Sequence, residues 1–157
     1  MSAALSEPVT HPLPPVAIRP VEAAAVPLIE SSWKRSYRRH LAEVSTSVYY
    51  DEMNRLVPAL LARSTVLVAC DPADPDQVYG YAVVEVDTRH APPRAIVHYV
   101  YVKSPFRRLG VGMRLIECAL ISSPTARCCS HITSTVTPWA SLRGIDYNPF
   151  AAVCRYQ

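Results

Sequence analysis

Glycine and charged residues are both scarce in this sequence. Of its 157 residues only four are glycine, and Asp, Glu, Lys and Arg make up 18%, with a formal net charge of +3. So small a net charge gives no indication of a nucleic-acid partner, and with 50% hydrophobic residues it argues against intrinsic disorder. The longest apolar runs, such as residues 66–69, are far shorter than the roughly 20 residues of a membrane-spanning helix. We therefore expect a folded protein with no membrane segment.

Patterns of export and of metal binding are lacking too. The N-terminus shows no basic segment followed by an apolar stretch, so we expect no secretion. The five cysteines, Cys70, Cys118, Cys128, Cys129 and Cys154, include no C-x-x-C pair. We expect reduced thiols, with the neighbours Cys128 and Cys129 as small packing residues, and no metal site.

Proline is abundant, and its placement suggests how the chain is organised. The chain has 15 prolines, about twice the usual share, and four of them stand within the first 15 positions. We expect residues 1–15 to form a flexible tail. Residues 16–157 then form one domain, long enough to bury roughly two-thirds of its unfolded surface.

Hydrophobic periodicity predicts the elements of this domain. Apolar residues recur every four positions from Ile29 to Leu41, as in a helix. A second helix is expected at 49–63, with a kink or a fresh helix start at Pro58. In chain order we expect a strand at 16–20, then the two helices, and then a hairpin of strands at 65–70 and 78–86. A buried central strand at 95–102 follows, and after it come a helix at 111–120, a last strand at 130–136 and an irregular end. This order predicts a mixed α/β sheet domain.

Four cations follow the apolar stripe of the first helix. Lys34, Arg35, Arg38 and Arg39 fall at i, i+1, i+4 and i+5, which places them on one helix face. We expect this face to be exposed to solvent. It is either an ordinary solvated face or a docking surface for an acidic protein or nucleic acid. The net charge is too small to decide between these, and we expect nucleic acid less than a protein partner.

One motif carries chemistry, at the junction between the central strand and the next helix. Two of the four glycines stand there, in the pattern Arg107-x-x-Gly110-x-Gly112. A strand that turns directly into a helix points unpaired N–H groups and the positive end of the helix dipole at one spot. Glycine lets a phosphate approach those amides, and Arg107 and Arg108 add positive charge at the rim. The turn therefore predicts a pyrophosphate site, and the alternative is a tight turn that merely needs glycine.

This pattern resembles the signature of the GCN5-related N-acetyltransferase (GNAT) family, and the order of elements resembles that family over about 16–137. A dinucleotide-binding loop would instead need G-x-G-x-x-G early in the chain with an acidic residue about twenty positions later. The resemblance implies a mostly antiparallel mixed sheet flanked by helices, with acetyl-CoA as cosubstrate. It places the pyrophosphate on Arg107, Arg108, Leu109, Gly110, Val111 and Gly112, and the pantetheine arm on backbone groups of Tyr101, Val102 and Lys103.

After residue 137 the sequence departs from the family pattern. Family members carry a tyrosine four residues before a Gly-Phe pair, and that tyrosine protonates the departing thiolate. Here the equivalent pair is Gly144-Ile145, and Ala140 stands in place of the tyrosine. Tyr147 and Tyr101 are the candidate substitutes, although either could be a packed aromatic residue. The segment 147–150, Tyr-Asn-Pro-Phe, resembles small acetyltransferase-like proteins encoded by bacteriophages.

Transfer to an amine requires a base or an ordered water that takes a proton from the ammonium form. His98 on the central strand is the first candidate, because an imidazole titrates near neutral pH. Glu85 on the neighbouring strand is the competitor. The alternatives are a hydrogen-bonded core histidine and a solvent-facing glutamate on an alternating strand.

The sequence therefore predicts an acetyl-CoA-dependent N-acetyltransferase acting on a small-molecule amine or on a protein lysine or N-terminus. The alternative is a non-catalytic protein of the same fold, with or without bound CoA, that works by binding a partner protein. Loss of the usual tyrosine favours the alternative, and the intact phosphate turn favours the enzyme. A homodimer stays open, and we expect a cytoplasmic protein of a bacterium or of a phage-infected cell.

Overall fold

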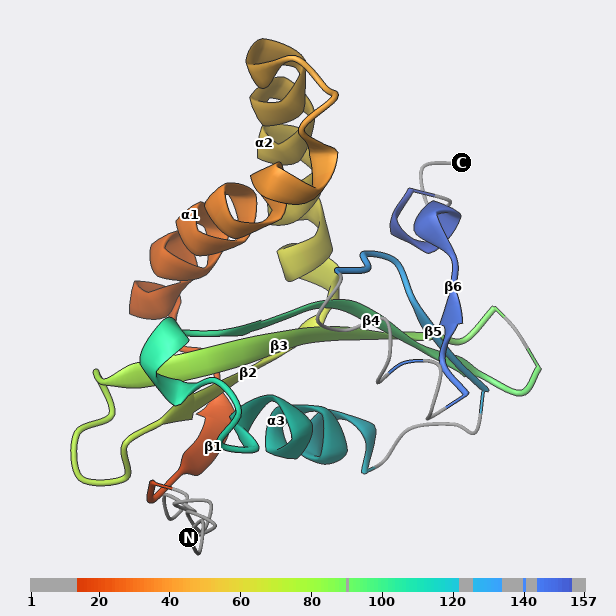
Figure 1. Cartoon of the computed structure of the whole chain (residues 1–157). Coiled ribbons are helices and arrows are strands. Elements are labelled where there is room, and N and C mark those ends of the chain that lie inside the picture. The colour runs from red at the N-terminus through yellow and green to blue at the C-terminus, as the bar shows by residue number, and fades with distance from the viewer. Residues whose placement is uncertain (1–13, 90, 122–125, 134–139, 141–143, 154–157) are drawn as a thin grey trace, which may run out of the picture.

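The computed structural model describes residues 14–89, 91–121, 126–133, 140 and 144–153 (Figure 1). Its main elements are β1 (Ala17–Pro20), α1 (Val26–Tyr37), α2 (Thr46–Arg63), β2 (Thr65–Cys70), β3 (Val78–Asp87), β4 (Arg94–Val102), α3 (Val111–Leu120), β5 (Ala126–Cys129) and β6 (Asp146–Tyr147). The described residues also include four 3₁₀ turns: η1 (Ala23–Ala25), η2 (Arg38–Leu41), η3 (Ser104–Phe106) and η4 (Pro149–Ala152). Helices α1 and α2 cover one face of the sheet and α3 covers the other (Figure 1).

The strands form one six-stranded sheet in the order β1-β2-β3-β4-β5-β6. Neighbours from β1 to β4 are antiparallel, whereas β4–β5 and β5–β6 are parallel. The predicted mixed, mostly antiparallel sheet with flanking helices is therefore confirmed. The predicted hairpin is β2 with β3, and β4 lies inside the sheet as expected.

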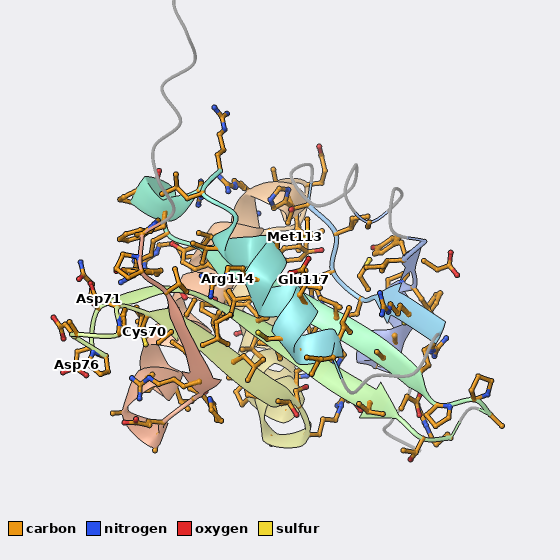
Figure 2. All side chains as sticks on the ribbon, turned by 90° about the horizontal axis from the view of Figure 1, so that it is seen from below. Cys70, Asp71, Asp76, Met113, Arg114 and Glu117 are labelled. Carbon is orange, nitrogen blue, oxygen red and sulfur yellow. The ribbon has the colours of Figure 1, made fainter. Side chains whose placement is uncertain are left out.

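Each face of the sheet has its own hydrophobic core. The α1/α2 core joins the apolar stripes of both helices to β2, β3 and β4, and it contains Trp33, Met53, Leu60, Tyr81, Val83 and Tyr99 among others. The α3 core lies on the opposite face and contains Val84, Val97, Val111, Leu115, Cys129 and Ile145 among others. Figure 2 shows α3 lying across this face, with Arg114 and Glu117 on its exposed side.

Helix α2 corrects one expectation about Pro58. The helix does not start afresh there but runs from Thr46 to Arg63 with the proline inside it. Proline in a helix interior costs about 3 kcal/mol, whereas burying one large apolar side chain contributes about 1.5–3 kcal/mol. Val57 and Leu60 on either side of Pro58 are both fully buried. Packing of this face therefore offsets the lost hydrogen bond.

The last strands differ from the expected ones. We expected a strand at 130–136 and an irregular end, but β5 comprises Ala126–Cys129 and ends where the predicted strand begins. Residues 134–136 of the predicted strand lie outside the described residues. A short strand, β6, and the turn η4 follow in the segment expected to be irregular. Pairing with β4 determines where β5 lies, because Ala126–Cys129 are the residues that face Arg94–Val97.

Two further expectations concern the whole chain. Residues 1–13 of the expected tail lie outside the described part, so the division into a tail (1–15) and a domain (16–157) stays a prediction. In the described part of the chain, none of the helices combines the length and the apolar character needed to cross a bilayer.

Gly80 of β3 provides a test of the contact between β3 and β4. A Cβ atom at this position would lie 2.4 Å from the carbonyl oxygen of Tyr101, so backbone would have to move. We expect Gly80→Ala to lower the free energy of unfolding by about 1–3 kcal/mol, measured by urea denaturation. The matched control is Gly112→Ala, whose Cβ would find its nearest neighbour at 3.4 Å and would gain helix propensity. Equal losses in the two variants would contradict the close approach.

Candidate active site

The candidate site lies where β4 and β5 separate. The two strands pair from Arg94↔Ala126 to Val97↔Cys129, and the Ser130 N–H donates to the Val97 carbonyl at 3.1 Å. Beyond that point, among the described residues, β4 has only β3 as a neighbouring strand. A cavity at this divergence is lined by Val97, Tyr99, Val100, Cys129, His131, Thr133, Ala140 and Ile145.

The residues that line this cavity come from both faces of the sheet. Tyr99 belongs to the α1/α2 core, whereas Val97, Cys129 and Ile145 belong to the α3 core. Side chains of the two cores therefore meet in the gap between β4 and β5.

The predicted phosphate turn lies at the end of β4 and leads into α3. Gly110 adopts a left-handed conformation with φ of +80° and is the N-cap of α3. Arg108 also has a positive φ, of 63°, which is uncommon for a residue with a side chain. The first turn of a helix has N–H groups with no partner inside the helix, and α3 presents these just after Gly110. The geometry matches an anion site.

The other residues predicted to bind the cosubstrate have mixed surroundings. Arg107 Nε donates to the Val102 carbonyl at 2.9 Å, so this guanidinium ties the turn to β4 instead of only lining a rim. The Lys103 N–H donates to the Tyr79 carbonyl at 2.8 Å. Val111 is buried in the α3 core, Leu109 and Tyr101 are partly buried, and a Cβ on Gly112 would touch Val102. Binding by these residues stays a prediction.

The two candidate bases, His98 and Glu85, lie side by side in the sheet. His98 Nε2 lies 2.8 Å from Glu85 Oε2, and both side chains are almost completely buried. Arg63, the last residue of α2, donates from Nε to the same carboxylate oxygen at 3.0 Å. It also donates to the Ala152 carbonyl at 2.7 Å. The alternative of a solvent-facing Glu85 is therefore wrong.

Three functional candidates escaped the sequence analysis because they meet only in the folded chain. Ser130 Oγ lies 2.7 Å from His98 Nδ1 and 2.9 Å from His131 Nδ1. His131 is partly buried and lines the cavity, and its ring packs edge-on against those of Trp33, Tyr37 and Tyr99. Arg63 completes the chain of contacts from the helix side. In the sequence, Ser130 and His131 are two adjacent residues at the start of an expected strand, and their spacing matches no site motif.

The environment controls the charge of these groups. Burial alone would raise the pKa of Glu85, but hydrogen bonds from His98 and Arg63 hold that pKa below its ordinary value. Burial lowers the pKa of His131 to about 3, and the nearby His98 adds to the effect. Burial likewise raises the pKa of Tyr37 to about 12. At neutral pH the site therefore holds an ionised Glu85, an uncharged His131 and an uncharged Tyr37.

The candidate acids take separate positions. Tyr147 lies on β6, half exposed, in register with Cys129. Tyr101 packs against the ring of Tyr81 on the α1/α2 side. Ala140, in the position of the missing tyrosine, is buried and lines the cavity. Among the described residues that line the cavity there is neither Tyr147 nor Tyr101, so an acid role for either stays a prediction.

The predicted basic face is only half exposed. Arg35 and Arg39 are exposed as expected. Lys34 pairs with Glu30 at 3.3 Å, and its side chain is only 14% exposed. Arg38 donates to the carbonyls of Leu41 and Val44 and lies over the ring of Tyr49. The expectation of four solvated cations is therefore wrong for Lys34 and Arg38, because carbonyl groups at the end of the helix and a neighbouring carboxylate bind them.

The cysteines match the expectation where they are described. Cys70, Cys118, Cys128 and Cys129 are free thiols, and Cys128 and Cys129 are both buried. Cys154 lies outside the described residues. Within the described ranges, His, Cys, Asp and Glu side chains nowhere form a group of three that could hold a metal ion.

The sequence matches a family of known proteins, and the fold is similar to that of solved structures. Residues 27–146 match the sequence profile of the Acetyltransferase (GNAT) family. No curated protein matches the sequence. Among solved structures, one of a GCN5-related N-acetyltransferase from Ralstonia eutropha has a TM-score of 0.64 at 15% identity, covering 82% of this chain and 91% of that one.

Two other structures show the same fold. A predicted acetyltransferase from Clostridium acetobutylicum, solved with acetyl-CoA, has a TM-score of 0.62 at 14% identity, covering 83% of this chain and 90% of that one. Glucosamine-6-phosphate N-acetyltransferase from Arabidopsis thaliana has a TM-score of 0.51 at 13% identity, covering 85% and 92%. At these identities the likeness concerns the fold.

The buried carboxylate of Glu85 gives a prediction about stability and pH. Its folded pKa lies below the ordinary 4.5, so the stability it contributes is present above pH 4.5 and is lost as the pH falls through the folded value. We expect Glu85→Gln to lower the free energy of unfolding by about 3 kcal/mol at pH 7. The difference from the unaltered protein should shrink as the pH is lowered below 4.5, in urea unfolding at several pH values.

The matched control for this experiment is Glu52→Gln. The side chain of Glu52 is 65% exposed and pairs with Arg55 on the surface of α2. Its replacement should cost no more than about 1 kcal/mol. If the stability of Glu85→Gln differed from that of the unaltered protein by the same amount at every acidic pH, Glu85 would not be the group that titrates.

Proposed function

The chain belongs to the Acetyltransferase (GNAT) family, which uses acetyl-CoA, and we propose that it transfers the acetyl group to a primary amine of a small molecule. One observation carries this proposal. The cavity between β4 and β5 is lined by Val100, which lies near Gly112 of the phosphate turn. It is also lined by His131, which Ser130 links to the buried His98. A thioester and an amine can meet there from opposite faces of the sheet.

The α3 side of the cavity suits the cosubstrate. Val100 lines the cavity, and a Cβ on Gly112 would lie 3.9 Å from its side chain, so the phosphate turn adjoins the cavity directly. The amides after Gly110 and the charge of Arg108 then favour the pyrophosphate. Along Tyr99–Tyr101 no strand of the described part of the chain pairs with the second edge of β4, and this edge offers backbone groups to an extended arm.

The α1/α2 side suits an uncharged amine. The cavity residues on this side are aromatic or titratable: Tyr99, whose pKa burial raises, and His131. Such a wall disfavours an ammonium unless a base removes its proton. The chain's role is therefore to hold the amine against the thioester carbonyl, to exclude water and to accept one proton.

A protein acceptor is the second candidate within the same activity. A protein acceptor would dock on the basic face formed by Lys34, Arg35, Arg38 and Arg39. Of these four cations only Arg35 and Arg39 are exposed, so the face gives weak support to a protein acceptor. A small-molecule amine is therefore the favoured acceptor. The non-catalytic alternative would bind acetyl-CoA at the same turn without consuming it.

Release of free CoA thiol tests the proposal. The purified protein is incubated with acetyl-CoA and a panel of polyamines, amino sugars, aminoglycosides and lysine-containing peptides. We expect at least one small amine to be acetylated in a reaction that saturates with acceptor. Tight binding of acetyl-CoA with no acceptor-dependent release of thiol would instead support the non-catalytic alternative.

Arg108 tests the phosphate turn. One charged hydrogen bond is worth about 1.5–3 kcal/mol, so Arg108→Glu should weaken acetyl-CoA binding by roughly tenfold or more in calorimetry. Raising the salt concentration should reduce the difference, because the contact is exposed to solvent. The matched control is Arg55→Glu, which makes the same charge change on the exposed surface of α2. An equal loss of affinity in both variants would contradict a local phosphate contact.

A further inference from the structure

A continuous line of hydrogen-bonding groups runs from the cavity into the interior of the protein. It begins at His131, which lines the cavity, and passes through Ser130 to His98, with steps of 2.9 and 2.7 Å. His98 in turn lies 2.8 Å from Glu85. We propose that this line is a proton relay: His131 receives a proton from the acceptor ammonium, and the charge is stored on His98 beside Glu85.

A β-bulge creates the relay. Val83 pairs with Tyr99, but the next residue, Val84, pairs with Val97, so His98 is an extra residue in β4. Val97 packs in the α3 core and Tyr99 in the α1/α2 core. The bulge therefore places His98 between them, facing Glu85 and Ser130. Bulges reorient side chains in this way near functional sites.

The chemistry of Glu85 determines the direction of the hydrogen bonds. Its carboxylate is ionised and can only accept, so His98 Nε2 carries a proton. In an uncharged His98 the other nitrogen, Nδ1, is then an acceptor for the Ser130 hydroxyl. Ser130 Oγ can accept in turn from the Nδ1–H of His131. This arrangement leaves Nε2 of His131 unprotonated and ready to accept.

When His131 takes up a proton, the donor and the acceptor exchange roles in both hydrogen bonds of Ser130. An N–H bond of the ammonium breaks and an Nε2–H bond forms on His131. The proton on Nδ1 of His131 then moves to Ser130 Oγ. The hydroxyl proton of Ser130 moves in turn to His98 Nδ1. The amine lone pair then forms the C–N bond while the C–S bond breaks, and the thiolate takes up the second proton that the nitrogen loses. His98 later returns its proton to water along the same line. The sum is one amide, one CoA thiol and one released proton.

Storage on His98 explains why His131 need not be a strong base. The low pKa of His131 means that a charge does not stay on it. His98 instead lies directly beside the carboxylate of Glu85, which Arg63 holds in place. An imidazolium beside a buried carboxylate is stabilised electrostatically. His98, Ser130 and Glu85 are thus positioning and proton-storing residues, and His131 is the member that meets the substrate.

This inference rests on the proposed acetyl transfer, and two measurements separate the two claims. The first is kinetic, with whichever small amine the unaltered protein acetylates. Ser130→Ala should lower kcat by about 10²-fold or more and leave the KM for acetyl-CoA unchanged, and Ser130→Thr, which keeps the hydroxyl, should restore most of kcat. His131→Gln should show the same loss of kcat. The matched control is Ser32→Ala, a buried serine of α1 that bonds Tyr81 outside the line, and its kcat should be unchanged.

The second measurement needs no substrate. Nitrogen-15 chemical shifts of the histidine rings in the folded full chain, at pH 8, should show His98 protonated at Nε2 and His131 protonated at Nδ1. In Ser130→Ala, His131 should lose its preference for Nδ1–H. A His131 protonated at Nε2 in the unaltered protein would overturn the relay, as would full kcat in Ser130→Ala or in His131→Gln. A protein with the expected ring protonation that releases no thiol with any amine would overturn the proposed function alone.

Discussion

The separation of β4 from β5 after Val97 is the constraint on which the site depends. While the two strands pair, their backbone groups satisfy one another, and no space exists between them. Beyond that pair β4 keeps its contact with β3, no other strand among the described residues pairs with its second edge, and the cavity forms there. A sheet that stayed paired along its full length would separate the phosphate turn from the residues on the opposite face.

The bulge at His98 adds polar groups to this opening at an energetic cost. Burying Glu85, His98 and Ser130 removes them from water, and each would destabilise the fold without a partner. They satisfy one another, and Arg63 supplies the positive charge from the end of α2. Helix α2 is therefore tied to the site as well as to the core, since the same guanidinium also bonds Ala152 of η4.

Several features could be predicted from the sequence because each has a local cause. The four-residue spacing from Ile29 to Leu41 indicated α1, and the glycines of the phosphate turn marked the junction of β4 and α3. The continuous apolar character of 95–102 predicted an interior strand. In each case neighbouring residues alone determine the conformation, through periodicity, through a positive φ or through burial on both faces.

Other features depended on contacts between residues far apart in the chain. The sequence indicated His98 as a candidate base. Nothing in the neighbouring residues shows that β4 has one extra residue relative to β3, or that Ser130 and His131 lie in line with His98. The last strand was predicted at 130–136 instead of Ala126–Cys129 for the same reason, because the position of β5 depends on which residues pair with β4. The exposure of Lys34 and Arg38 depended on a carboxylate and on carbonyl groups that only the folded helices bring near. The sequence by itself determined the helices, the first four strands and the glycine turn before α3, because those follow from local spacing and local backbone conformation. Only the tertiary structure decided the line of hydrogen bonds from His131 through Ser130 to His98, because contacts between strands require a register that local sequence does not encode.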